Sequence, residues 1–326
     1  MTRVPVVFIC DRHYVIPTAV AITSLIENRN PQTHYDIYVV AAELSETEIN
    51  KFFEFRECQT DIHVISISLK KFEGICSKSL YITPAACLKF DLPNLIPQHE
   101  KVLYLDGDIL IQKDLSDLFA INIDDAYAAA VKDLPLKNNS LNIQDYFNSG
   151  VMLLNLKLLR ENNMPTALLH LRKTATGLTC MDQDCFNLLF EKKVQFLPMT
   201  YNCFYGFFLR FRNKYTLDYI NQGFGTTYAS YDEMNKDSHI VHLVGWDKPW
   251  MYFDSALSRE WDDYFQKSPF KHHRLKRKSM KLEDFIESHP VLNNLYYFFR
   301  FWRGKGFKFA VGKAKEYFAH KEKVQP

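Results

Sequence analysis

The chain has 326 residues, 47% of them apolar, which is enough for one large core with a smaller appendage. Its eleven glycines and thirteen prolines exclude a collagen-like or low-complexity protein. The net charge of +2 gives no reason to expect a polyanionic partner for the chain as a whole.

The seven cysteines are scattered and form no CxxC pair. We expect mostly buried thiols in a reducing compartment, and neither a disulfide framework nor a zinc site. The opening segment, MTRVPVVFICDRHY, has a short apolar run that leads directly into charged residues, which does not fit a signal peptide. No stretch approaches about eighteen consecutive apolar residues, so no membrane span is expected. These features predict a cytoplasmic protein.

The first 110 residues alternate between the patterns of buried strands and of helices. The expected strands are residues 4–10, 35–41, 61–67 and 101–105. The expected helices are residues 18–26, a segment from about Ser45 with Glu48 placed for a capping box, and residues 84–95. Such β-α-β alternation predicts a mostly parallel sheet with helices on both sides.

The pattern becomes mixed after residue 109. The expected strands there are residues 127–131 and 151–156, and the expected helices are residues 165–174 and 182–190. Residues 200–240 are rich in Tyr, Phe, Gly and Asn, which predicts a loop-dominated region around a site. The composition becomes basic and then aromatic near residue 265. We therefore expect a catalytic domain over residues 1–265 and a C-terminal helical region over residues 266–326.

A pair of carboxylates, Asp106 and Asp108, follows the strand KVLYL with Gly107 between them. Alternate residues of an extended segment point to the same side, and Gly107 leaves the backbone open to a close ligand. The position lies beyond the carboxyl end of a predicted parallel strand, where open α/β sheets bind ligands. Two adjacent carboxylates repel each other unless a cation or proton lies between them. The pattern indicates a divalent metal site, with two turn-capping aspartates as the alternative.

Two later segments add polar residues beside apolar strands. Asn148, Ser149 and Gly150 lead into VMLLNL, where small polar groups can hydrogen-bond hydroxyls and the glycine lets a ligand approach. His242 can complete a metal site of oxygen and imidazole ligands, and Lys248 can meet a diphosphate as a point charge. Each feature alone is more often structural: a turn into a core strand, a buried histidine and a surface lysine.

Together these segments resemble the retaining glycosyltransferase family 8, which includes bacterial lipopolysaccharide galactosyl- and glucosyltransferases. The resemblance covers roughly residues 3–262 and rests on the order and spacing of VVFICDRHY, KVLYLDGDILI, FNSGVMLLNLK, MDQDCFN and HLVGWDKPW. It implies an α/β nucleotide-diphospho-sugar transferase fold of the GT-A type. It also implies transfer of a hexose, galactose or glucose, from a UDP-sugar to a saccharide in cell-surface glycan synthesis, with Mn²⁺ or else Mg²⁺ as the cofactor.

The resemblance assigns roles position by position. Asp106, Asp108 and His242 match the metal ligands. The implied donor-binding set has four parts. Asp11 and His13 lie near the nucleotide, and Gly245 and Lys248 lie at the diphosphate. Asp106, Gly107 and Asp108 lie at the metal, and the residues near the donor sugar are Lys89, Asp133, Asn148, Ser149, Asp182 and Gln183. Where the family commonly has an arginine before the carboxylate pair, this chain has Lys89, which keeps the charge but loses the planar fork.

Gln183 matches the residue near the reacting carbon, and Asp182 is the second catalytic candidate. An amide oxygen is a poor nucleophile, and Asp182 and Asp184 do not share the direction of Gln183 because neighbours on a helix face different ways. We therefore expect a front-face route with retention, in which the departing phosphate takes the acceptor proton and Gln183 stabilises positive charge. Asp184 fits better as an acid at a helix N-terminus.

The C-terminal region combines a basic cluster, residues 267–281, with an aromatic and basic stretch, residues 290–310. This combination favours peripheral binding to the anionic inner face of the cell membrane and a lipid-linked acceptor. The alternative is a helical pair that packs on the core. We expect no nucleic-acid partner. The alternative functions are a non-catalytic nucleotide-sugar or glycan-binding protein, and a metal-dependent phosphoesterase, which would need a second cluster of His and Asp.

Overall fold

The structure is a computed structural model, and the residues that it describes are 1–58, 60–72, 84–133, 141, 143, 145–178 and 180–281. The chain forms two compact units. One comprises residues 1–246 and 259–274, and the other comprises residues 247–258 and 275–326. The expected division at residue 265 stays a prediction, because most of the C-terminal region lies outside the described residues.

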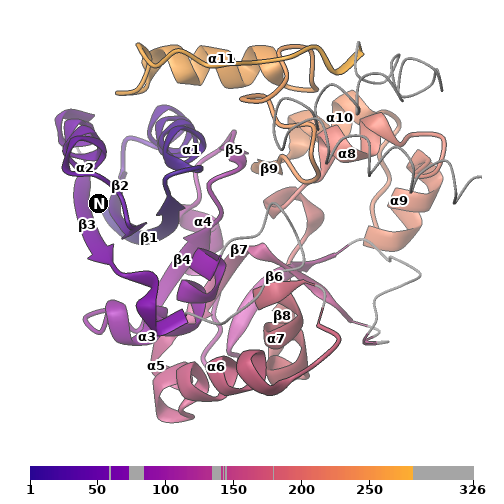
Figure 1. Ribbon diagram of the computed structural model, residues 1–326. Coiled ribbons are helices and arrows are strands. Elements are labelled where there is room, and N and C mark those ends of the chain that lie inside the picture. Colours follow the sequence, from indigo (N-terminus) through magenta and orange to yellow (C-terminus); the bar gives the residue numbers. More distant parts are fainter. Residues whose placement is uncertain are drawn as a thin grey trace, which may run out of the picture. The chain divides into compact units, whose positions relative to one another are not determined.

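The described part of the first unit contains a sheet with the strand order β3-β2-β1-β4-β7-β6-β8 (Figure 1). Its strands are β1 (Thr2–Asp11), β2 (Thr33–Ala42), β3 (Asp61–Ile67), β4 (Lys101–Leu105), β6 (Ala128–Lys132), β7 (Phe147–Asn155) and β8 (Val194–Phe196). Pairing is parallel from β3 to β4 and between β6 and β8, whereas β7 runs antiparallel to both β4 and β6. The predicted mostly parallel sheet is confirmed, and two of its strands have the predicted bounds.

Helices follow the strands as the alternation predicts. The α-helices are α1 (Val15–Glu27), α2 (Glu46–Phe52), α3 (Leu92–Leu95), α4 (Ser116–Ala120), α5 (Leu156–Glu161), α6 (Met164–Thr174), α7 (Met181–Phe190), α8 (Tyr205–Arg210), α9 (Leu217–Phe224), α10 (Tyr231–Asp237) and α11 (Ser258–Lys267). The 3₁₀ helices are η1 (Phe53–Cys58), η2 (Leu69–Phe72), η3 (Pro84–Asp91) and η4 (Met199–Tyr201). The predicted capping box begins α2, because Ser45 accepts from the Glu48 backbone N–H and the Glu48 carboxylate accepts from that of Ser45.

A large hydrophobic core lies against one face of this sheet. Side chains of β1, β2, β4, β6 and β7 pack there against η3, α3 and α5 to α7. The ring of Phe186 on α7 lies edge-on to Phe90 of η3 at a centroid distance of 5.3 Å and also packs on Phe190. This packing fixes the end of β4, the beginning of β7 and the start of α7 relative to one another.

The loop that follows β5 (Ile109–Ile111) is tied to the sheet by Asp114. Its carboxylate accepts hydrogen bonds from the Asn30 backbone N–H at 2.8 Å and from the hydroxyls of Thr33 and Tyr35 at 3.1 and 3.0 Å. It also accepts from the Ser116 backbone N–H at the start of α4. One carboxylate thus connects β2, the turn before it and α4.

Two sequence-based expectations are wrong in detail. Residues 200–240 are not loop-dominated, because they form α8, α9 and α10. Thr216 and Ser230 cap α9 and α10, and Gly225, at φ +68°, ends α9. The aromatic composition reflects packing, since Phe204 and Phe208 are fully buried. The expected helix at 84–95 is mostly the 3₁₀ helix η3, and only its last turn is α-helical.

A second, two-stranded sheet was not predicted. β5 pairs antiparallel with β9 (Ile240–His242). Strands of three residues are too short to show a period in the sequence, so this pairing is a product of the tertiary fold.

The second unit is small in its described part. Asp254 accepts hydrogen bonds from the Ser279 hydroxyl at 2.7 Å and from the Lys281 backbone N–H at 3.1 Å, and Tyr252 pairs with Lys278. Across the described residues, no helix combines the length and the apolarity that crossing a bilayer would require. The aromatic stretch 290–310 lies outside the described residues.

Candidate active site

A cleft of about 450 Å³ opens at one edge of the main sheet. The topology explains why polar residues from distant segments meet there. The carboxyl ends of β1 and β4 lie at this edge, and the antiparallel β7 begins at the same edge, opposite the end of β6. The predicted site residues that line the cleft are Asp11, Lys89, Asp106, Gly107, Asp108, Asp133, Asn148, Ser149, Asp182, Gln183 and Gly245.

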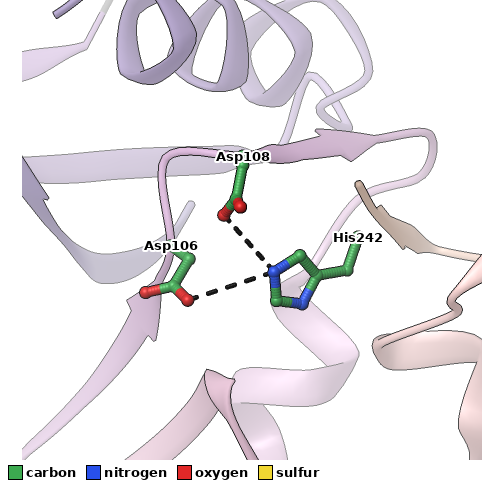
Figure 2. Close-up of side chains that lie close together, drawn as sticks. All are labelled: Asp106, Asp108 and His242. Atoms are coloured by element: carbon green, nitrogen blue, oxygen red, sulfur yellow. Dashed lines mark ion pairs between the residues drawn. The ribbon is translucent and has the colours of Figure 1, made fainter. Parts of the chain in front are cut away.

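The predicted metal ligands converge (Figure 2). Asp106 follows β4, Asp108 precedes β5, and the antiparallel register places His242 opposite Ile109. The Nε2 atom of His242 lies 3.3 Å from Oδ1 of Asp108 and 4.0 Å from Oδ2 of Asp106. One ligand atom from each residue lies within 4.8 Å of the other two. This spacing fits a single divalent ion held by two carboxylates and an imidazole.

Two glycines leave space around these ligands. A Cβ atom on Gly150 would lie 2.3 Å from Cε1 of His242 and 2.8 Å from Oδ2 of Asp106. A Cβ atom on Gly107 would lie 2.4 Å from the hydroxyl oxygen of Thr18. Both distances are far below van der Waals contact, so a side chain at Gly150 would displace the two ligands and one at Gly107 would displace Thr18.

Asp106 is held from the side opposite to His242. The Tyr104 hydroxyl donates to Oδ1 of Asp106 at 2.5 Å, and Nζ of Lys89 lies 3.1 Å from the same oxygen. Burial, reinforced by the negative charge of Asp106, raises the pKa of Tyr104 well above its usual value, so the phenol remains a donor. Oδ2 of Asp106 is the oxygen that points toward His242.

The first turn of α7 presents its two acidic residues in different directions. Asp182 was expected to point away from the direction of Gln183, but both residues line the cleft. Oδ2 of Asp182 lies 2.7 Å from Nζ of Lys89 and accepts from the Ser149 hydroxyl at 2.9 Å. Asp184 instead accepts from the Tyr146 hydroxyl at 2.6 Å and is buried. Asp184 therefore has a structural role, whereas Asp182 lines the cleft.

Gln183, between these two aspartates, also lies in the cleft. Its Oε1 atom accepts from the Asn148 side chain at 3.2 Å and from the Ser149 backbone N–H at 3.1 Å. Its Nε2 atom donates to Oδ2 of Asp133 at 2.6 Å. The amide is thus held at both ends beside the other predicted donor-binding residues.

Among the residues that the sequence analysis missed, Tyr14, Tyr104 and Asn202 bear most on the site. Tyr14 lines the cleft, and burial together with Asp108 and Asp106 raises its pKa. Tyr104 alternates with Asp106 on an extended segment, which was an available signal. Asn202 is fully buried, and its Oδ1 lies 3.0 Å from Nδ1 of His242. No pattern in the sequence marks Asn202, because its contact arises only from the packing of η4 near β9.

One predicted donor-binding residue, His13, is not among the described residues that line this cleft, and another, Lys248, lies in the second unit. The side chain of His13 is exposed, and its backbone N–H donates to the Asp11 carboxylate at 2.9 Å. Lys248 belongs to the second unit, where its Nζ lies 5.7 Å from the ring centroid of Trp250. The roles predicted for both stay predictions. Among the described residues, no second cluster with metal-ligand spacing is found.

The chain is similar to known proteins over most of its length. Residues 5–254 match the model of glycosyl transferase family 8. A lipopolysaccharide 1,2-glucosyltransferase of Escherichia coli is 26% identical over 269 residues, which are 78% of this chain and 75% of the relative.

Solved structures share the fold. The galactosyltransferase LgtC, in complex with donor and acceptor sugar analogues, has a TM-score of 0.67 at 23% identity, over 81% of this chain and 96% of that chain. The bifunctional glycosyltransferase WbbM has a TM-score of 0.67 at 21% identity over 83% of this chain, which spans about half (51%) of WbbM. The predicted nucleotide-diphospho-sugar transferase fold of the GT-A type is therefore confirmed.

Proposed function

The chain belongs to glycosyl transferase family 8, and from this membership we propose that it transfers a hexose from a UDP-sugar to a saccharide acceptor with retention. Glucose or galactose is the proposed hexose, and lipopolysaccharide, lipooligosaccharide or another cell-surface glycan is the proposed product. The names of a lipopolysaccharide glucosyltransferase and of a galactosyltransferase among the similar proteins support this choice. The observation that carries the proposal is one cleft that holds Asp106 and Asp108, next to His242, together with Gln183.

We propose Mn²⁺ as the bound ion, with Mg²⁺ as the alternative. Carboxylate oxygens suit both ions, and the imidazole of His242 favours Mn²⁺ over Mg²⁺. The ion would neutralise the charge that develops on the departing diphosphate. Asp106 and Asp108 would hold it from one side, and Tyr104 and Lys89 would keep Asp106 in place.

The donor would lie along the cleft. We propose that Asp11 and His13 contact the nucleotide and that Gly245 and Lys248 bind the diphosphate. The sugar would meet Lys89, Asp133, Asn148, Ser149 and Asp182, and Gly107 would allow close approach to the ion. Asp133 accepts a hydrogen bond from Gln183, and Asp182 lines the same cleft, which supports the sugar-binding assignment.

We favour a front-face mechanism because the contacts of Asp182 make it a poor nucleophile. A double displacement needs a nucleophile, and Oδ2 of Asp182 already carries an ion pair with Lys89 and a hydrogen bond from Ser149. Gln183 is an amide and a weak nucleophile. In the proposed step the bond from the anomeric carbon to the phosphate oxygen breaks while a bond to the acceptor oxygen forms on the same face. The acceptor proton passes to the departing phosphate, and Gln183 stabilises the positive charge at the anomeric carbon.

A lipid-linked acceptor at the inner face of the cell membrane is the proposed partner. In the basic cluster 267–281, the exposed cationic side chains include Lys267, Lys271, Arg274 and Lys276. Exposed cations of this kind attract anionic lipid surfaces. The aromatic part of the proposed surface lies outside the described residues.

The decisive experiment is a screen of UDP-glucose and UDP-galactose with saccharide acceptors and Mn²⁺, followed by proton NMR of the first product. We expect transfer with the anomeric configuration of the donor retained. Asp108→Asn should reduce turnover on the order of 100-fold or more, whereas Asp125→Asn, at an exposed position, should not. Binding of UDP without turnover would favour a sugar-binding protein. Release of phosphate without transfer would favour a phosphoesterase, and an inverted product would refute the retaining mechanism.

A further inference from the structure

Four hydrogen bonds join the proposed metal ligand His242 to Asp133 through three side-chain amides. Nδ1 of His242 lies 3.0 Å from Oδ1 of Asn202, and Nδ2 of Asn202 donates to Oδ1 of Asn148 at 2.9 Å. Nδ2 of Asn148 donates to Oε1 of Gln183 at 3.2 Å, and Nε2 of Gln183 donates to Asp133 at 2.6 Å. The chain therefore runs from the metal site to the proposed sugar site.

Backbone groups fix the direction of this chain. The orientation of a side-chain amide must be inferred from its partners. The backbone N–H of Gly150 donates to Asn148 at 3.0 Å, and that of Ser149 donates to Gln183 at 3.1 Å. A backbone N–H can only donate, so the atoms that it meets on Asn148 and Gln183 must be oxygens. The nitrogen of each amide is then the atom that donates to the next member.

The same logic sets the tautomer of His242. Because the Asn148 oxygen meets Asn202, the group that Asn202 presents to it must be the NH₂. The Asn202 oxygen therefore faces His242, so Nδ1 of His242 carries the proton. Nε2 faces Asp106 and Asp108 and is therefore the nitrogen that would be free of a proton when a metal ion lies between them.

We propose that Asn202 is a positioning residue that holds His242 in the Nδ1–H tautomer and couples the metal ligand to the orientation of Gln183. Its burial is complete, so water does not compete for its amide. The catalytic half of this inference rests on the proposed function, whereas the tautomer half concerns the metal-free protein alone. The competing view is that Asn202 only satisfies buried polar groups. In that case its removal would lower stability without changing the tautomer.

The first test reads the tautomer directly. Long-range ¹H–¹⁵N NMR of histidine-labelled, metal-free protein in alkaline buffer distinguishes the two neutral forms, and His242→Gln assigns the signal. We expect the Nδ1–H form in the parent chain and a mixture or the Nε2–H form in Asn202→Ala. An unchanged Nδ1–H signal in folded Asn202→Ala would overturn the proposal.

The second test separates the two ends of the chain. In Asn202→Asp, a carboxylate oxygen still accepts from His242, but no donor remains for Asn148. We expect Mn²⁺ affinity near that of the parent chain. Turnover should fall on the order of 10- to 100-fold, as is usual when a residue that hydrogen-bonds to a metal ligand is replaced. Asn202→Ala should also weaken Mn²⁺ binding, on the order of 10- to 100-fold by calorimetry. Full turnover in Asn202→Asp would overturn the coupling, even if Asn202→Ala failed to fold.

A control variant tests whether the loss of any structural side-chain amide has the same effect. Asn155→Ala removes an asparagine at the far end of β7 that caps α5 through the Leu158 backbone N–H at 2.9 Å. It should lower thermal stability without changing the tautomer of His242 or the Mn²⁺ affinity. If no nucleotide sugar were a substrate, the proposed function would fail while the tautomer result could still stand. The two failures are therefore distinguishable.

Discussion

The ammonium nitrogen of Lys89 lies 2.7 Å from a carboxylate oxygen of Asp182, and both side chains are buried. The same nitrogen lies 3.1 Å from Asp106. Burial opposes the charge of Lys89, yet Asp106 and Asp182 together raise its pKa above the usual value, so it is cationic at neutral pH. One buried cation therefore bridges a proposed metal ligand and the helix that presents Gln183.

Lys89→Met should leave two carboxylates beside each other without their buried cation. Breaking a buried ion pair from one side costs about 3–5 kcal/mol, which urea unfolding of the metal-free protein would measure. The matched control is Lys157→Met, which removes an exposed ion pair with Glu100 at 3.5 Å. Exposed pairs contribute about 0–1 kcal/mol. Equal losses of unfolding free energy in Lys89→Met and Lys157→Met would show that the Lys89 bridge does not stabilise the fold.

Gly150→Ala should damage the metal site through steric contact, because the new Cβ would lie 2.3 Å from Cε1 of His242. A displacement of about 1 Å at a catalytic group can cost on the order of 100-fold in turnover. We expect such a loss, together with weaker Mn²⁺ binding by calorimetry. Gly223→Ala is the control, since a Cβ there meets nothing within 4 Å on α9. Its stability should rise slightly, by about 0.5–1 kcal/mol. Normal Mn²⁺ affinity in Gly150→Ala would argue against the assigned ligands.

The carboxylate pair was predictable from its spacing after an apolar strand, whereas His242 was assigned as a ligand only through the resemblance to family 8. The geometry between them was not predictable. It depends on the pairing of β5 with β9, whose strands are too short to give a periodic signal. Hydrophobic patterning also leaves strand direction open. The reversed direction of β7 is what places Asn148 and Ser149 at the same edge as Asp106.

Lys89 and Asn202 mark the limit of sequence reasoning in different ways. Lys89 was expected near the donor, but its burial between two carboxylates depends on how η3 packs on the sheet. Asn202 lies in a region interpreted as loop-dominated, where aromatic content was taken as a sign of a site. Packing of Phe204 and Phe208 in the core explains that content instead.

Asp114→Asn should lower stability in a pH-dependent way. Burial would raise the pKa of Asp114, but hydrogen bonds from Ser116, Asn30 and Tyr35 lower it below the ordinary 3.8. A carboxyl group with a lowered folded-state pKa adds stability that is fully present above its unfolded-state pKa. That stability is lost as the pH falls through the folded-state value. We expect a cost of about 1–3 kcal/mol at neutral pH, from the hydrogen bonds to a charged acceptor.

Urea unfolding at several pH values tests this sign. The difference between the parent chain and Asp114→Asn should be constant from neutral pH down to about pH 5 and should shrink below 3.8. Asp125→Asn, at an exposed position, is the control and should show little difference at any pH. If the difference in unfolding free energy between the parent chain and Asp114→Asn grew as the pH fell, hydrogen bonds to an ionised Asp114 would not be its cause.

A chain that ends at Lys281 should separate chemistry from membrane binding. Ending it earlier, at Pro269, would remove Phe270, which is buried and packs on Phe52 at a centroid distance of 5.6 Å. Residues up to Lys281 also include the groups that Asp254 binds. Because the cleft is built from residues up to Gly245, the shortened chain should transfer to a soluble acceptor at close to the full-length rate.

Vesicle co-sedimentation at low and high salt then tests the membrane proposal. Both chains keep the basic cluster 267–281, so both should bind anionic vesicles at low salt. Each well-placed Lys or Arg contributes about 1 kcal/mol of binding free energy. Salt screens that attraction. Only the full chain keeps the aromatic stretch 290–310, whose insertion into the headgroup region would resist salt. We therefore expect the full chain alone to stay bound at high salt. Equal binding by both chains at high salt, or failure of the shortened chain to fold, would remove the aromatic stretch as a membrane anchor.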